Sequence, residues 1–326
     1  MDIAEQGGVD PDIKAYRQTE LTFAFERELS SKYLLKARYT RKKLDRAVED
    51  AGFVTASGSE AYIIGNPGLG LVKSFYEQNG WTPVKAKRQY DAVEIGINRR
   101  FADDYYFNAN YTWSRLWGNY SGLASSDEEG RTDPNVSRAF DAPFTEACVC
   151  GGETVGLLAT DRPHVFKFSG AYSLDWNRRF GMGQNNTTEF QTFFVAQSGT
   201  PLSTFINVAG YDSIFLNGRG DMGRTDFYTQ TDFAIRHRYK FGRDNRFTFV
   251  AEMDITNLFN QNAVTDRYNN SDTTNSFSLT DPANGLVTVA EANTLDDGAL
   301  TSLAERRFQA NGAPVIATKQ MLRLQM

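Results

Sequence analysis

The sequence has few of the residues that build metal sites or disulfide frameworks. Its 326 residues include only two cysteines, Cys148 and Cys150, and two histidines, His164 and His237. The cysteines and histidines lie in different segments, so they do not form the ligand cluster of a zinc site, and two cysteines do not make a disulfide framework. Neither histidine has a Ser, Cys or Asp at catalytic spacing. We therefore expect no catalytic residue, metal or cofactor, and no enzyme activity.

The chain also lacks a basic excess and a long apolar run. Its formal net charge is −5, so it has no overall basic field to recruit nucleic acid. No segment approaches the roughly 20 apolar residues that a membrane-spanning helix needs. The first residues, Met1–Glu5, have neither the charged nor the apolar region of a secretory signal peptide. For an exported protein, this predicts a fragment whose true N-terminus lies upstream.

Aromatic residues, in contrast, are abundant. The chain has 24 Phe, 15 Tyr and 4 Trp, together 13% of its residues. Two architectures explain this content: a soluble all-β sandwich, or a membrane β-barrel with aromatic girdles. A barrel exposes its lipid-facing residues only at alternate positions, so its mean hydropathy, here −0.48, resembles that of a soluble protein.

Alternation of apolar and polar residues predicts about nine strands. The clearest is 105–117, where Tyr105, Phe107, Tyr111 and Trp113 fall on one face. The phase of 188–199 stays open because Phe193 and Phe194 are adjacent. The nine segments are 20–29, 32–42, 90–101, 105–117, 164–176, 188–199, about 229–241, 247–256 and about 315–326.

Strand and loop lengths separate the two architectures. Globular strands are typically about 5 to 6 residues long, whereas a 12-residue strand at about 3.3 Å per residue, tilted about 45°, crosses roughly 28 Å, close to a bilayer core. The connections 30–31, 102–104, 177–187 and 242–245 are short, and those at about 43–89, 118–163, 200–228 and 259–314 are long. Short periplasmic turns and long extracellular loops are typical of outer-membrane barrels.

The polar faces of these segments carry many charges. Burying them in the dry centre of a sandwich would be costly, whereas a hydrated or plug-filled lumen tolerates them. The charged positions are Lys36, Arg38, Lys167, Arg236, Arg238, Glu252 and Asp254.

Six stretches, in order along nearly the whole chain, resemble the Oar-like group of TonB-dependent receptors. They are Arg38–Asp50, Tyr90–Glu94, Asn108–Ser114, Asp161–Phe166, Ser198–Leu202 and Asp254–Asn260. The resemblance implies an all-β fold, an antiparallel transmembrane barrel of 22 strands with an N-terminal plug, located in the cell outer membrane. It implies import of a ligand with energy passed on by TonB.

On this basis residues 1–326 are expected to be the C-terminal portion of the barrel, without plug domain or signal peptide. The expected partners are outer-membrane lipid, the missing N-terminal barrel and plug, an unknown extracellular ligand, and the TonB complex through the missing plug only. The ligand-binding residues are unknown from the sequence. The alternatives are a structural or adhesive barrel that imports nothing, and a soluble β-rich binding module.

Several short motifs have a simpler interpretation than a functional site. The pair Cys148 and Cys150 is interpreted as a loop disulfide or two incidental thiols, and the acidic run 127–133 as a solvated loop without the spacing of a calcium loop. The glycine-rich stretch 65–70 lacks the Lys-Ser/Thr of a phosphate-binding loop, which leaves turn chemistry. The tripeptide 219–221, Arg-Gly-Asp, is interpreted as a chance match to an adhesion motif. The aromatics Tyr105, Trp113, Trp117, Tyr172 and Trp176 are interpreted as interfacial girdles rather than a sugar-stacking platform.

Overall fold

One antiparallel sheet of nine strands dominates the computed structural model, which describes residues 8–54, 60–78, 83–121, 140, 154–182, 186–209, 211–215, 217–267 and 277–278. The strands follow the order β14–β13–β10–β9–β7–β6–β3–β2, with the short β8 beside β7. This path is open, so β2 and β14 are its two edges. The strands are β2 (Arg17–Glu28), β3 (Tyr33–Arg46), β6 (Arg88–Ala102), β7 (Tyr105–Gly118), β8 (Gly156–Leu157), β9 (His164–Asp175), β10 (Asn186–Gln197), β13 (Tyr228–Phe241) and β14 (Phe247–Ile255).

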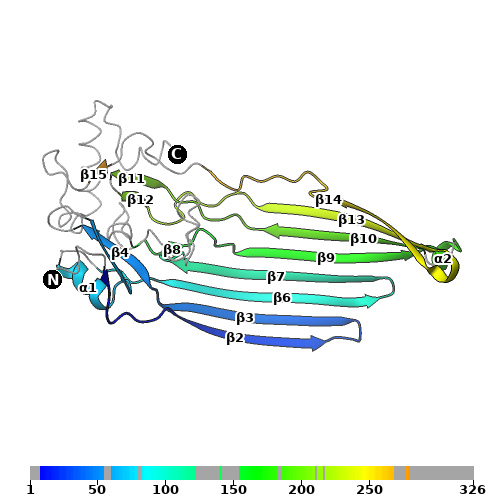
Figure 1. The fold of residues 1–326 in the computed structure, drawn as a ribbon, viewed down its shortest axis with the longest axis horizontal. Coiled ribbons are helices and arrows are strands. Elements are labelled where there is room, and N and C mark those ends of the chain that lie inside the picture. Colours follow the sequence, from blue (N-terminus) through cyan, green and yellow to red (C-terminus); the bar gives the residue numbers. More distant parts are fainter. Residues whose placement is uncertain are drawn as a thin grey trace, which may run out of the picture.

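The prediction of eight long strands is confirmed, and Figure 1 shows them side by side along the longest axis. The strand expected after the connection 200–228 begins at Tyr228. Its first residues are polar and show no apolar alternation, yet they continue the ladder with β10 as far as Gln197. The strand expected at about 315–326 lies outside the described residues.

Short connections gather at one end of the sheet and long ones at the other, as predicted (Figure 1). One short connection contains an unexpected helix, α2 (Trp176–Phe180), which Asp175 caps by accepting a hydrogen bond from the Arg178 amide at 3.0 Å. Another contains a 3-10 turn, η4 (Arg243–Asn245). Among the described residues, no helix is long and apolar enough to span a membrane.

The long connections carry structure that the alternation did not predict. Between β3 and β6 lie β4 (Glu49–Val54), β5 (Glu60–Gly65) and α1 (Gly70–Gln78); β1 (Gly8–Val9) pairs with β5. At the same end of the sheet (Figure 1), β11 (Phe205–Ala209) pairs with β12 (Tyr211–Phe215) and β15 (Phe277–Ser278). The loop end therefore has a framework of its own.

Cross-strand register gives the sheet one apolar and one polar face. One row of side chains crosses five strands, and each residue in it is paired with the next on the adjacent strand. The row is Phe25, Ala37, Ile95, Tyr111 and Phe166. The same register resolves the phase of β10. Phe194 lies opposite Phe168 on the apolar face, and Phe193 lies opposite Ser169 on the polar face.

The apolar face is uncovered. Tyr111 and Phe249 are 38% and 55% exposed, and Phe107 and Phe168 are not buried either. Leaving such a continuous aromatic face in water would be costly. In the described part of the chain no second sheet packs over it, which excludes the soluble sandwich.

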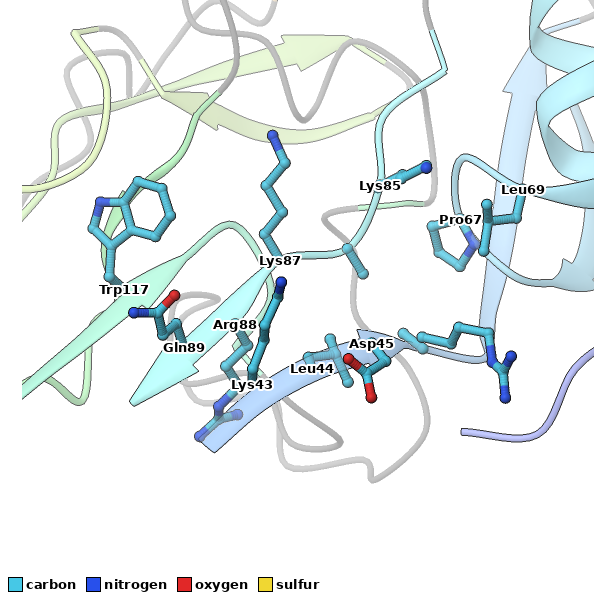
Figure 2. Close-up of a pocket in the computed structure, with 13 residues that line it drawn as sticks. Lys43, Leu44, Asp45, Pro67, Leu69, Lys85, Lys87, Arg88, Gln89 and Trp117 are labelled. Atoms are coloured by element: carbon cyan, nitrogen blue, oxygen red, sulfur yellow. The ribbon is translucent and has the colours of Figure 1, made fainter. Parts of the chain in front are cut away.

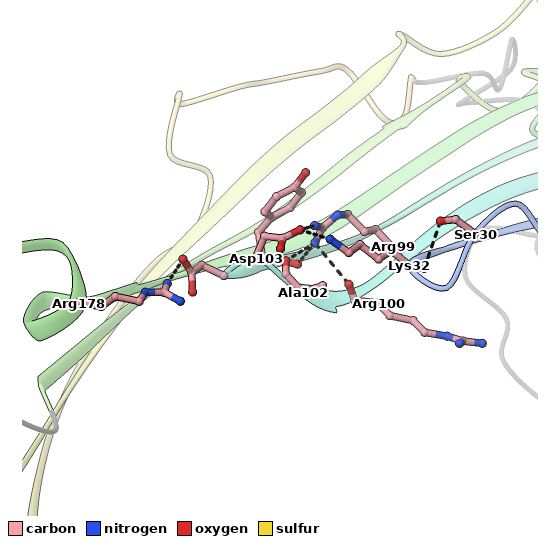
Figure 3. A network of polar contacts seen from close by, with 9 residues as sticks. Ser30, Lys32, Arg99, Arg100, Ala102, Asp103 and Arg178 are labelled. Carbon is pink, nitrogen blue, oxygen red and sulfur yellow. Dashed lines mark hydrogen bonds and ion pairs between the residues drawn. The ribbon is translucent and has the colours of Figure 1, made fainter.

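Arg99 braces the turn between β6 and β7 (Figure 3). Its side chain is buried under the Tyr105 ring, 3.4 Å from the ring centroid, and it donates to the Ala102 carbonyl at 2.6 Å. It also donates to Asp103 at 2.9 Å, and Lys32 from the neighbouring turn donates to the same carboxylate at 2.5 Å. These bonds, Lys32 foremost, hold the pKa of Asp103 below its usual range. The two turns are thereby tied together.

A small core stabilises the loop end. It consists of Leu44, Ala47, Tyr120 and Phe140. Tyr120 is completely buried, and this burial, with the nearby Glu49 carboxylate, raises the pKa of its hydroxyl. The phenol therefore stays neutral, and the base of the first long loop is fixed to the end of β7.

Candidate functional site

Ion pairs line the polar face in cross-strand register. Arg236 and Glu252, directly opposite on β13 and β14, form a two-pronged pair with a closest distance of 2.7 Å. Arg38 donates to Glu94 at 2.5 Å across β3 and β6. These pairs are exposed and each contributes little to stability, about 0–1 kcal/mol. Their main effect is to make this face hydrophilic and to leave few charges without a partner.

One charge without an ion-pair partner lies in a hollow near the loop end of the polar face. The hollow has a volume of about 360 Å³, and its lining includes Glu94, Asn110, Thr112, Arg162 and Lys167. Glu94 is paired with Arg38, and Arg162 donates to the Ser198 carbonyl at 2.7 Å. Lys167 has no ion-pair partner among the residues the structure describes, and its side chain is exposed. The hollow therefore offers an ammonium group surrounded by amide and hydroxyl groups, a set that suits an anionic, hydrogen-bonding solute.

A second hollow lies further along the polar face and has the opposite charge. Its volume is about 370 Å³, and its lining includes Tyr106, Gln191, Phe193, Asp232 and Asp254. Asp232 accepts hydrogen bonds from the Gln230 side chain and the Asn257 amide, both at 2.9 Å. The two hollows thus present different chemistry along one wall.

A buried ion pair clamps the rim above the first hollow. Asp161 is 1% exposed and receives hydrogen bonds from Arg224 and from the Leu116 amide, both at 2.5 Å. Arg224 also donates to the Gly199 carbonyl at 3.1 Å. Gly199 is required there, since a Cβ would lie 1.9 Å from the Thr225 carbonyl oxygen. Three loops therefore meet at one point. No sequence pattern indicates this role, although Asp161 and Gly199 lie in two of the stretches that resemble the Oar-like receptors.

The Arg-Gly-Asp tripeptide is used inside the loop framework. Arg219 donates to the Thr154 carbonyl at 2.7 Å and its guanidinium lies 4.4 Å from the Phe215 ring centroid. Asp221 accepts from both the amide and the hydroxyl of Thr204, each at 2.7 Å. The two side chains that an adhesion receptor would bind therefore make contacts within the protein instead.

The other short motifs have equally local roles or lie outside the described residues. Gly68 adopts a positive φ of 66° in the turn before α1, and Gly70, the first residue of α1, adopts a positive φ of 51°, which confirms turn chemistry for residues 65–70. The histidines lie apart, His164 bonded to the Tyr111 hydroxyl at 2.7 Å and His237 to Thr188 at 2.8 Å. No cluster of metal-ligating residues exists among the described residues. The cysteine pair and the acidic run 127–133 lie outside them.

The candidate girdle aromatics fall into two groups. Tyr105 and Tyr172 face each other at the turn end of β7 and β9. Trp113 lies further along β7, opposite His164, and Trp117 lies at its loop end. Trp176 begins α2 at the turn end. They therefore do not form one continuous platform, and their separation along the strands matches two belts near opposite membrane surfaces.

Comparison with known proteins agrees with this geometry. Residues 4–217 match the family described as outer membrane beta barrel domain. Over 258 residues the chain is 35% identical to the TonB-dependent transporter Oar of Myxococcus xanthus, an alignment that covers 78% of this chain and 22% of that protein. The chain thus spans about a fifth of the length of this relative. No solved structure matches.

The family match covers more than half of the chain, and the open antiparallel sheet has the polarity of a membrane wall. The chain therefore belongs to the outer membrane β-barrel family and forms an Oar-like barrel wall of the cell outer membrane.

Proposed function

We propose that residues 1–326 form the C-terminal portion of a TonB-dependent receptor barrel, and that this wall guides a ligand from the extracellular loops into the lumen. The proposal rests mainly on the hollow near the loop end of the polar face. Its lining residues come from β6, β7 and β9 and from the loop before β9, and Lys167 supplies an ammonium group that no described carboxylate neutralises. The wall acts by binding and guiding rather than by catalysis.

The open edges support a place within a larger barrel. β2 and β14 each have one side without a partner strand among the described residues. Inside lipid, every backbone polar group must be paired, so these edges require further strands. The short alignment to a much longer transporter fits the same arrangement. In this arrangement the plug would fill the lumen next to the ion-paired face, and TonB would act through the plug.

The experiment compares solute uptake by cells with and without the protein. Wild-type cells, cells lacking the gene, and cells with Lys167→Glu are grown in a defined mixture, and depletion of each solute is measured by mass spectrometry. We expect at least one anionic solute whose depletion requires the gene, stops when a protonophore collapses the proton gradient, and falls at least fivefold in Lys167→Glu. Reversing this charge turns attraction into repulsion.

Lys240→Glu is the matched control, because Lys240 also lies on the polar face but at the turn end of β13. It should leave uptake within twofold of wild type. If the protein reaches the outer membrane and no solute depends on both the gene and the gradient, import is refuted. Gene-dependent attachment of cells to a surface, without such uptake, would instead identify the adhesive alternative.

A further inference from the structure

A basic hollow opens at the loop end of the sheet (Figure 2). Its volume is about 530 Å³. Five of its six charged lining residues are basic; the six are Lys43, Arg46, Lys85, Lys87, Arg88 and Asp45.

Strand register places part of this lining on the membrane-facing side. Lys43 pairs with Gln89, and Gln89 pairs with Trp117. Four residues further along the same strands, Tyr39 and Trp113 occupy the same face of the sheet, which is its apolar, lipid-facing one. In Figure 2, Lys43 and Lys87 extend in the same direction, and Arg88 extends in the opposite direction.

The positive charge of the hollow is not neutralised by its own acidic residue. Asp45 already accepts a hydrogen bond from Thr19 at 2.6 Å and lies 3.3 Å from Arg17. Within the described ranges, neither Lys43 nor Lys85 has an ion-pair partner, and both side chains are exposed. A basic hollow of this kind binds anions, and phosphate groups in particular.

The backbone that carries Lys85 and Lys87 is held in place by hydrogen bonds and close packing. The Asn119 side chain accepts a hydrogen bond from the Lys87 amide at 2.7 Å and donates to the Lys85 carbonyl at 3.1 Å. At Gly118, whose φ is 153°, a Cβ would lie 1.9 Å from the Lys87 carbonyl oxygen, so only glycine permits this approach. The site is therefore ordered before any ligand arrives, which lowers the entropic cost of binding.

The position of the hollow along the membrane normal indicates which anions can reach it. Four residues separate Trp113 from Trp117, which is about 13 Å along a strand and about 9 Å along the membrane normal at a tilt of about 45°. An aromatic belt lies at the edge of the hydrocarbon layer. Lys43, which is in register with Gln89 and Trp117, thus lies just beyond that edge, on the side of the long extracellular loops, where headgroups of the outer leaflet are found.

We propose that this outer-face hollow binds the phosphorylated glycolipid headgroup of the outer leaflet, with Lys43 and Lys85 as its phosphate ligands. Each ammonium group donates charge-assisted hydrogen bonds to phosphate oxygens. The bound lipid would anchor the loop end of the wall at a fixed depth. The inference rests on the outer-membrane location of the chain and not on its proposed role in uptake.

The test uses the protein extracted from its own outer membranes and reconstituted in nanodiscs of zwitterionic phospholipid. Binding of bis-phosphorylated lipid A, of the same lipid A after dephosphorylation, and of inorganic phosphate is measured by native mass spectrometry and by titration. We expect bis-phosphorylated lipid A to bind at least tenfold more tightly than either of the other probes. The double variant Lys43→Gln/Lys85→Gln should lose at least tenfold of this affinity.

A matched double variant, Lys36→Gln/Lys240→Gln, removes the same charge from the lumen face and should stay within twofold of wild type. Replacing Lys43 and Lys85 by arginine should retain binding, and Lys43→Gln alone should lose at least threefold, which keeps the test valid if the double variant fails to fold. Equal loss in both glutamine double variants would overturn the proposal, as would equal binding of dephosphorylated lipid A. Inorganic phosphate that binds as tightly as the lipid would assign the hollow to a soluble anion instead.

Discussion

Replacing Asp161 by alanine should loosen the loop-end rim while the strands stay paired. The carboxylate is 1% exposed and takes hydrogen bonds from Arg224 and from the Leu116 amide. Removing one partner of a buried pair costs about 3–5 kcal/mol. Because the Arg224 side chain is 28% exposed, we expect the lower end, about 3 kcal/mol, which is roughly a hundredfold increase in the open population.

Hydrogen exchange measures this local opening directly, because the Leu116 amide is bonded to the residue that is removed. In the protein purified from membranes, exchange at Leu116 should accelerate about a hundredfold in Asp161→Ala. Asp161→Asn keeps an acceptor for this amide and loses only the charge, so its acceleration should be intermediate. The double variant with Arg224→Ala should cost less than the sum of the two single changes, because no charge is then left buried without its partner.

Glu26→Gln provides the control, since it breaks an exposed pair with Lys36 at 3.2 Å. Such pairs contribute about 0.2–1 kcal/mol, less than about a fivefold effect. If Asp161→Ala also changes exchange at Leu116 by less than fivefold, the reasoning that the clamp holds the rim is refuted.

Four further predictions test other parts of the structure. Gly199→Ala forces a Cβ to 1.9 Å from a backbone oxygen and should lower thermal stability or prevent folding, whereas Gly96→Ala, whose nearest atom is an amide side chain at 3.3 Å, should be tolerated in the same melting experiment. Arg99→Ala removes a buried guanidinium with its hydrogen bonds and should speed protease cleavage at the turn between β6 and β7, with Arg100→Ala, an exposed neighbour, as comparison. The pKa of Asp103 is lowered in the folded state, so this carboxylate stabilises the fold above the usual carboxyl pKa near 3.9, and the contribution is lost as the pH falls through the lowered pKa. Lys32→Gln should raise the pKa of Asp103 in an NMR titration. An unchanged pKa would contradict the role given to Lys32. The 326-residue chain made alone should associate through the edges of β2 and β14, and a monodisperse monomer in light scattering without detergent would be inconsistent with open edges in an unpaired sheet.

The sequence was sufficient for the positions of the long strands and for their faces. In β7, Phe107, Tyr111 and Trp113 alternate with polar residues. Alternation with a period of two over this length indicates a β-strand with one apolar and one polar face. The sorting of short and long connections is also local information. It was enough to identify a membrane wall and to exclude a sandwich.

Register needed the tertiary structure. The adjacent Phe193 and Phe194 fit either phase equally well, and only pairing with β9 and β13 assigns Phe194 to the lipid side. The polar first residues of β13 likewise show no apolar alternation, and the ladder with β10 establishes that they belong to the strand. These features belong to pairs of strands rather than to one segment.

The candidate sites were decided by the tertiary structure for a related reason. Asp161 and Arg224 are separated by 63 residues, and nothing within either segment indicates the other. The outer-face hollow likewise joins Lys43 to Lys85 and Trp117 from three segments. Amino-acid alternation determines which face a side chain takes, but only the packing of the loops determines which side chains meet.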